Sequence, residues 1–170
     1  MNPLFALNRG CNTAVGCNTA SVCNTGRVCV MGILNVTPDS FSDGGRFLDK
    51  TRAVQRAVEM AAQGADIIDV GGISTRPGSE AVDVKEELER VIPVVEALSG
   101  RIDIPVSVDT YRAVVAEAAL GVGATVVNDI SAMQFDPQMA SVVAKSGAWI
   151  VLMHIKGTPK DMQLNPVYED

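Results

Sequence analysis

Five short apolar runs alternate along the chain with stretches whose apolar residues recur at helical spacing. Runs of this kind without polar alternation are typical of buried strands, and recurrence every three to four residues is typical of amphipathic helices. In the second helical stretch Asp83 and Glu86 have capping-box spacing, and Pro93 predicts a kink or an early break. The predicted strands are 28–36, 66–70, 104–108, 124–127 and 149–153, and the predicted helices are 50–63, one starting at 83, 112–120 and 137–146.

The repeated order of strand and helix predicts an α/β fold. Strands that are apolar on both faces indicate a parallel sheet, because each intervening helix can act as the crossover between neighbouring strands. Right-handed crossovers of this kind build two architectures, a doubly wound sheet and a (β/α)8 barrel. The apolar pattern alone does not separate them.

Polar residues at the strand ends favour the barrel. In a barrel all carboxyl ends form one ring where sites are found, whereas in a doubly wound sheet only strands at the switch point converge. One strand-end Asn or Asp often only caps a turn, but five in register favour a ring. We therefore predict a (β/α)8 TIM-barrel type of fold, present as an incomplete barrel of about five βα units. The polar ends are Asn35, Asp69, Asp109, Asn128 and His154.

The composition is that of a globular protein. The chain has 170 residues, 47% hydrophobic and 20% charged, with a net charge of -6. An acidic chain without a basic cluster is a poor partner for nucleic acid or an anionic membrane. No apolar run is long enough for a membrane span and no secretory signal is legible, so we expect a cytoplasmic protein with no membrane partner.

The first 27 residues differ from the rest. They are rich in Asn, Thr and Gly, and three Cys-Asn-Thr triplets start at Cys11, Cys17 and Cys23, with Cys29 continuing the six-residue spacing. Metal ligands usually occur in closer pairs, and no histidine is near. We interpret residues 1–27 as a low-complexity leader with a tandem duplication, with a metal or redox role as the alternative, and residues 28–170 as the barrel domain.

Asp109 and Asn128 end neighbouring predicted strands and should point the same way. A carboxylate only accepts hydrogen bonds, while a carboxamide offers two donors and an acceptor. Together they suit a flat heterocycle with amino and lactam edges, such as a pterin or a purine. In an apolar pocket such a pair discriminates strongly, because a wrong ligand leaves it unpaired.

Other polar groups indicate an anionic ligand. The stretch 74–78 supplies hydroxyls, the Arg76 guanidinium and backbone amides that suit phosphate oxygens, although a solvated turn is a commoner role. Asn35 could give an oxygen ligand to Mg²⁺. His154 is the only histidine, and such a residue is more often structural than catalytic. No Ser-His-Asp or Cys-His arrangement is legible, which disfavours nucleophilic hydrolysis.

Five segments together resemble the dihydropteroate synthases, a family of pterin-binding barrels. The first signature of that family resembles MGILNVTPDSFSDGG at 31–45, and the second resembles IIDVGGISTRPG at 67–78. The likeness continues in order with SVDT at 107–110, NDI at 128–130 and LMHIKGTPKDMQ at 152–163. It extends from about residue 28 to the end of the chain.

The resemblance implies a transferase of folate biosynthesis. Such an enzyme condenses 6-hydroxymethyl-7,8-dihydropterin diphosphate with para-aminobenzoate, and it releases 7,8-dihydropteroate and diphosphate with Mg²⁺ as cofactor. By position, Asn35 matches the metal ligand, and Asp39 and Asp109 match an acidic pocket that stabilises positive charge on the pterin methylene. The implied substrate-binding residues are Phe41, Thr75, Arg76, Asp109, Asn128 and Met153. By resemblance, Phe41 lies with Asp39 in a first loop that closes over the second substrate, and Thr75 and Arg76 contact the diphosphate. Asp109 and Asn128 bind the pterin edge, and Met153 packs on the ring.

The chain departs from the family pattern in three places. Ile73 stands where many relatives carry Glu, the Cys-Asn-Thr leader precedes the first strand, and no strand after the fifth can be mapped. We therefore expect the 170-residue chain alone to be poorly stable and weakly active or inactive. The alternatives are the pterin-binding domain of a methyltetrahydrofolate methyltransferase and a non-enzymatic remnant. A homodimer is compatible with the sequence.

Overall fold

A single parallel sheet organises the part of the chain that the computed structural model describes, namely residues 28–37, 45–73, 82–158, 162 and 167. Of residues 45–49 only the backbone is described. The strands are β1 (Met31–Asn35), β2 (Ile67–Gly71), β3 (Val106–Asp109), β4 (Val126–Asp129) and β5 (Trp149–Leu152). The helices are α2 (Gly45–Ala62), α3 (Val84–Leu98), α4 (Ala113–Gly121) and α5 (Met139–Ser146).

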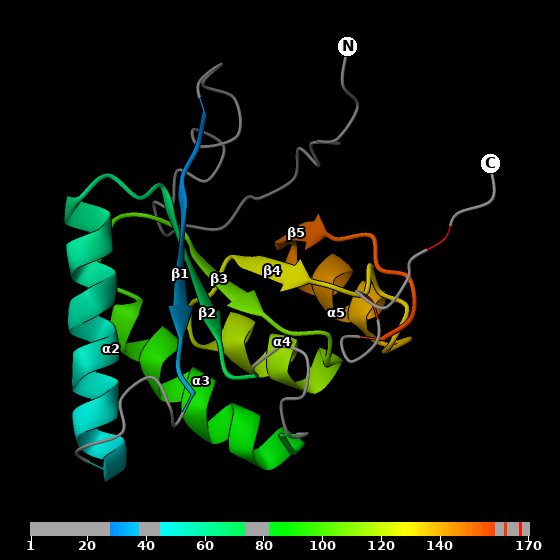
Figure 1. Cartoon of the computed structure of the whole chain (residues 1–170), viewed down its shortest axis with the longest axis horizontal. Coiled ribbons are helices and arrows are strands. Elements are labelled where there is room, and N and C mark those ends of the chain that lie inside the picture. The colour runs from blue at the N-terminus through cyan, green and yellow to red at the C-terminus, as the bar shows by residue number, and fades with distance from the viewer. Residues whose placement is uncertain (1–27, 38–44, 74–81, 159–161, 163–166, 168–170) are drawn as a thin grey trace.

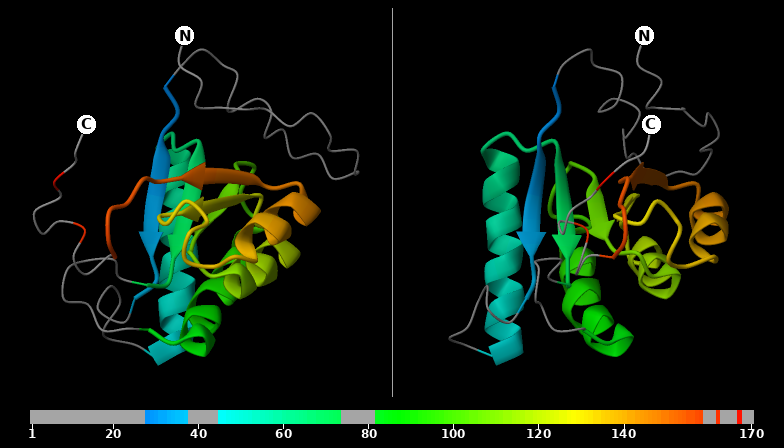
Figure 2. Two further views of the ribbon diagram at one scale, coloured as in Figure 1. Left: turned by 90° about the vertical axis from the view of Figure 1, so that its right-hand side faces the viewer. Right: turned by 45° about the vertical axis from the view of Figure 1, so that its right-hand side comes forward.

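The strands follow one another in the sheet as they do in the sequence. Their order is β1-β2-β3-β4-β5, and every neighbouring pair is parallel. The arrows turn steadily from β1 to β5, and consecutive helices pack on one another along one side of the sheet (Figures 1 and 2). A doubly wound sheet would reverse its strand order and place helices on both faces. The predicted α/β fold of barrel type, here an incomplete barrel of five strands, is confirmed.

The two faces of the sheet carry different side chains. Toward the helices the strands present buried Leu34, Ile68, Val70, Val108 and Val127, which form the core with the apolar stripes of the helices. Because side chains alternate along a strand, the intervening residues share the opposite face, which we call the inner face. It carries Ile33, Asn35, Asp69, Ser107, Asp109, Val126, Asn128, Trp149 and Val151.

Helix α3 follows its predicted start but not its predicted break. The Asp83 carboxylate accepts a hydrogen bond from the Glu86 amide at 2.7 Å and caps the helix. The Glu86 side chain pairs with Arg90 instead of completing a capping box. The helix continues through Pro93, so the early break was wrong. Burial of Val91, Val95 and Leu98 on either side of Pro93 explains why the helix persists.

The remaining boundaries differ by a few residues. Helix α2 begins at Gly45, five residues before the expected start at Lys50. Strands β3 and β4 end at Asp109 and Asp129, one and two residues later than predicted, because a polar residue can continue the backbone ladder after the apolar run stops. Within the described residues, no helix combines the length and apolarity needed to cross a bilayer.

Candidate functional site

Three of the predicted strand-end residues meet at one rim of the sheet. Asn35 is level with Gly71, Gly71 with Asp109, and Asp109 with Asn128. Gly71 leaves a gap in this row: a Cβ placed there would lie 3.3 Å from Asp109 Oδ2 and 3.7 Å from Asn35 Oδ1. The side-chain oxygens of Asn35 and Asp109 therefore border the same small space on the inner face.

Asp69 lies lower on the inner face than the sequence suggested. It was expected at a strand end, but β2 continues to Gly71, so Asp69 is level with Ser107 in the middle of the sheet. Its side chain is 3% exposed and accepts a hydrogen bond from Asn128 Nδ2 at 2.9 Å. Within the described residues, Asp69 Oδ1 and Ser107 Oγ have no hydrogen-bond partner. The inner face thus holds buried polar atoms directly below the rim.

The buried carboxyl groups of this cluster resist ionisation. Burial raises the pKa of Asp109 to about 7, and the nearby charges of Asp69, Glu87 and Asp129 add to the effect. Burial also raises the pKa of Asp69, although the neighbouring Ser107 hydroxyl and Asn128 amide favour its charged form. Asp109 therefore changes charge close to neutral pH, where a bound cation or hydrogen-bond donor can decide its state.

A second polar network supports the rim from the helix side. Glu87 of α3 is fully buried and accepts hydrogen bonds from Thr110 Oγ1 and Arg112 Nη1, each at 2.7 Å. Arg112 also donates to the carbonyl of Val82 at 2.7 Å. Because Thr110 follows Asp109 directly, this network links the end of β3 to the start of α3. Burial raises the pKa of Glu87, while Thr110 and the Arg112 guanidinium act in the opposite direction.

The loop after β4 is organised by Asp129. Its buried carboxylate accepts hydrogen bonds from the backbone amides of Ser131 and Met133 and from the Ser131 hydroxyl, each at 2.8 Å. Ala132 and Met133 adopt positive φ values of 50° and 65° within this turn. Three accepted hydrogen bonds offset the strain of that conformation, and they hold the turn beside Asn128.

The other predicted site residues are placed as follows. Met153 comes directly after β5 and is 36% exposed, and its backbone N–H donates a hydrogen bond to the backbone carbonyl of Asp129. His154 is exposed, beyond the end of β5. Asp39, Phe41, Thr75 and Arg76 lie outside the described residues, as does the leader at 1–27.

Sequence reasoning missed the buried partners of the rim. The Asp69–Asn128 hydrogen bond joins residues 59 positions apart, and Glu87–Arg112 joins residues 25 apart. One signal was available, since an Asp inside the apolar run 67–70 must be buried. Its partner could not be identified without the register of three strands.

The oxygen atoms around the Gly71 gap are suited to Mg²⁺. A carboxamide and a carboxylate are hard oxygen donors, and Mg²⁺ commonly uses only one or two protein oxygens together with water and substrate phosphates. Within the described part of the chain, no cluster of three or more His, Cys, Asp or Glu is arranged to enclose a metal. Asn35 and Asp109 supply two oxygens of this kind at the rim.

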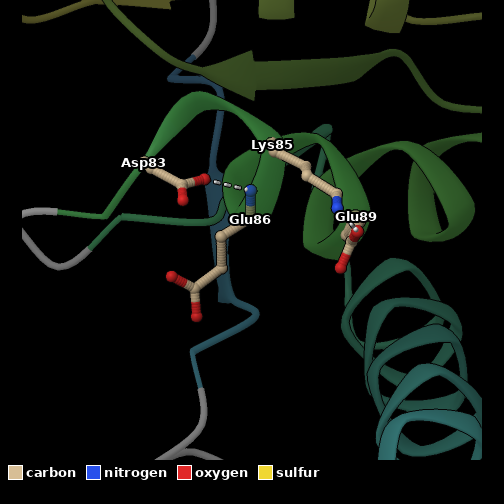
Figure 3. Close-up of a pocket in the computed structure, with 4 residues that line it drawn as sticks. All are labelled: Asp83, Lys85, Glu86 and Glu89. Carbon is tan, nitrogen blue, oxygen red and sulfur yellow. Dashed lines mark hydrogen bonds and ion pairs between the residues drawn. The ribbon is translucent and has the colours of Figure 1, made fainter.

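A separate surface depression lies at the start of α3. Figure 3 shows its lining residues Asp83, Lys85, Glu86 and Glu89, which project from the first turns of the helix. Asp83 is engaged as the helix cap and Lys85 pairs with Glu89. The depression is charged and open, and it contains none of the rim residues. We therefore place the candidate site at the rim of the sheet.

Comparison with known proteins identifies the family. Residues 31–170 match the family described as pterin binding enzyme. The chain is 55% identical over 141 residues to the dihydropteroate synthase of Synechocystis sp., covering 83% of this chain and 49% of that protein. It is 57% identical over 125 residues to the synthase of Staphylococcus haemolyticus, covering 74% of this chain and 46% of that protein.

Solved structures show the same likeness. The synthase of Clostridium difficile in the presence of pteroic acid is 56% identical, with a TM-score of 0.74 over 77% of this chain and 50% of that one. The Xanthomonas albilineans synthase with 4-aminobenzoic acid is 47% identical, with a TM-score of 0.76 over 85% and 50%. The chain spans about half the length of the relatives that it matches. With a family match over most of its length, the chain belongs to the pterin binding enzyme family.

Proposed function

We propose that this chain carries the pterin- and metal-binding half of a dihydropteroate synthase. The proposed reaction joins 6-hydroxymethyl-7,8-dihydropterin diphosphate to para-aminobenzoate and releases diphosphate. The observation that carries the proposal is the alignment of Asn35, Asp109 and Asn128 at one rim, in a chain 55% identical to a dihydropteroate synthase. These relatives favour a synthase over the methyltransferase alternative.

The rim supplies groups for each end of the pterin substrate. Asp109 and Asn128, side by side on β3 and β4, would form hydrogen bonds with the amino and lactam edges of the ring. Asn35 and Asp109, on either side of the Gly71 gap, would hold Mg²⁺. When bound there, Mg²⁺ would neutralise charge on the diphosphate and make it a better leaving group.

The acidic surroundings suit the charge that the reaction develops. As diphosphate departs, positive charge appears on the pterin methylene, and a nearby carboxylate stabilises it. Asp109 has a pKa of about 7, so a positive ligand should favour its ionised form. The amine of para-aminobenzoate then attacks the methylene carbon, and the reaction needs no covalent enzyme intermediate.

The remaining assignments stay predictions from the sequence. They comprise a closing role for Asp39 and Phe41, diphosphate contacts by Thr75 and Arg76, and packing of Met153 on the ring. A cytoplasmic location, a homodimer, and weak or absent turnover by the 170-residue chain also stay predictions.

Binding of the pterin diphosphate by the chain tests the proposal. Titration with and without Mg²⁺ should show tighter binding with the metal and weaker binding of the pterin alcohol that lacks diphosphate. Asp109→Leu and Asn128→Leu should each weaken binding by about tenfold to a hundredfold, because each leaves a ligand polar group unpaired. Asp103→Leu, which changes an exposed carboxylate before β3, is the matched control and should bind normally.

Two results would contradict the proposal. Equal binding of the pterin with and without diphosphate, unaffected by Mg²⁺, would favour a module that reads the pterin alone. Full binding by Asp109→Leu and Asn128→Leu would show that the ring does not occupy the rim.

A further inference from the structure

The hydrogen bond between Asp69 and Asn128 crosses a whole strand. Asp69 belongs to β2 and Asn128 to β4, and β3 lies between them. The residue of β3 level with Asp69 is Ser107, whose small side chain leaves room for Asn128 Nδ2 to reach Asp69 Oδ2 at 2.9 Å. The contact is therefore made by side chains on the inner face, and it does not follow from the backbone pairing of neighbouring strands.

The bond determines which end of the Asn128 amide faces the rim. An ionised carboxylate can only accept, so the amide must turn its nitrogen toward Asp69. Its oxygen is then directed away from Asp69. Turning the amide over would bring two oxygens together and lose a charge-assisted hydrogen bond, which is among the stronger kinds in proteins.

Asp69 is poorly explained as a structural residue. Asp69 is 3% exposed, and its Oδ1 makes no hydrogen bond of normal geometry within the described residues, with the Ser107 hydroxyl as its neighbour. No cation stands beside it in the described part of the chain to offset the cost of burying the charge. A neutral amide of the same shape would be cheaper to bury, so a carboxyl group at this position calls for another role.

We propose that Asp69 is a positioning residue that holds the Asn128 amide with its oxygen toward the ligand, so that the site selects a ring edge that donates a hydrogen bond. This inference rests on the proposed function, in which Asn128 reads the pterin edge. Its consequence is specificity: a ring that presents a carbonyl where pterin presents its amino group would meet an oxygen and be rejected.

The test compares pterin with lumazine, in which a carbonyl replaces the 2-amino group. The probes are the 6-hydroxymethyl diphosphates of both rings, and the measured quantity is the ratio of their dissociation constants at about pH 8, where Asp69 ionises more readily. In the unaltered chain we expect pterin to bind at least about tenfold more tightly.

Two variants separate positioning from mere packing. In Asp69→Asn, the introduced amide can donate as well as accept, so Asn128 can turn over and the ratio should fall by about fivefold or more. In the double variant Asp69→Asn/Asn128→Asp, the amide at 69 donates to a carboxylate at 128, which presents only acceptors. The ratio should then return to the level of the unaltered chain. A packing role predicts no such fall and recovery, since all these side chains have nearly the same shape.

Each outcome decides the inference. An unchanged ratio in Asp69→Asn, or a ratio that stays low in the double variant, would overturn the role of Asp69 while leaving pterin binding intact. No binding of the pterin by the unaltered chain would overturn the proposed function and the role of Asp69 together.

A second readout is the side-chain amide of Asn128 by NMR. Its hydrogen-bonded proton should exchange slowly in the unaltered chain and quickly in Ser107→Val, where the added bulk lies in the path of the bond.

Discussion

Asp109→Asn should stabilise the ligand-free chain, and the gain should grow as the pH rises. Asp109 has an ordinary pKa of 3.8 when unfolded and about 7 when folded. Below the lower value both states are protonated and the carboxyl costs nothing. Between the two values the unfolded chain loses its proton while the folded chain keeps it, so the free energy of unfolding falls with rising pH. Above about pH 7 the folded chain has lost this proton as well, and Asp109 lowers the free energy of unfolding no further.

The size of the effect follows from the shift. A change from 3.8 to about 7 spans roughly three pKa units, each worth about 1.4 kcal/mol. The greatest loss from this group is therefore about 4 kcal/mol, a large part of the stability of a domain. Replacing the carboxylate by an amide removes the titration, and it also relieves Asp69 of a neighbouring charge. The advantage of Asp109→Asn should thus increase by about 2 to 4 kcal/mol from acidic to weakly alkaline pH.

Urea unfolding at a series of pH values measures this advantage. The informative quantity is the change with pH in the difference between variant and unaltered chain, because it cancels the fixed effect of replacing oxygen by nitrogen. Asp103→Asn is the control, since that carboxylate is exposed before β3. Carbon NMR of the Asp109 carboxyl reports the same titration directly. A difference that does not vary with pH, together with a carboxyl that titrates near 4, would refute the reasoning.

Three other substitutions test contacts at the rim and elsewhere in the described fold. Arg112→Met should cost about 3 kcal/mol in urea unfolding at neutral pH, because it removes the ion-pair partner of the buried Glu87 carboxylate and leaves it only the Thr110 hydrogen bond. The loss should shrink in acid, where Glu87 takes up a proton, and an equal loss at neutral and acidic pH would contradict this. Gly71→Ala should keep the circular dichroism spectrum but weaken binding of the pterin diphosphate in the presence of Mg²⁺, because its Cβ would lie 3.3 Å and 3.7 Å from the two rim oxygens. Gly123→Ala should lower stability in thermal unfolding by at least about 2 kcal/mol. The position has a φ of +117°, and an added Cβ would lie 2.0 Å from the Ser99 hydroxyl, so an unchanged melting temperature would be inconsistent with this turn.

Local pattern was sufficient to predict the elements and their order. Apolar runs and helical spacing identified the five strands and four helices of the described residues, because burial on one face or on both leaves a period in the sequence. The residues at the ends of β1, β3 and β4 could also be recognised as a group, since parallel strands deliver their carboxyl ends to the same edge. The family resemblance depended on the same stretches.

The pattern failed where a residue's position depends on distant neighbours. Val58 lies at helical spacing from the buried residue Val54 but is 40% exposed, because the buried stripe of α2 is narrower than its apolar residues suggest. Pro93 lies inside a helix that tertiary packing sustains. Asp69 was expected beside Asn35 and Asp109, but Gly71 occupies that level.

The sequence by itself therefore determined which segments become strands and helices, and it placed Asn35, Asp109 and Asn128 at the strand ends. Only the tertiary structure decided that Gly71 opens a gap between two oxygens, that Asp69 reaches Asn128 across β3, and that Asp109 resists ionisation. The physical reason is the range of the interactions. Periodicity is set by near neighbours in the chain, whereas strand register, burial and the electrostatic cost of a charge are set by groups far apart in sequence.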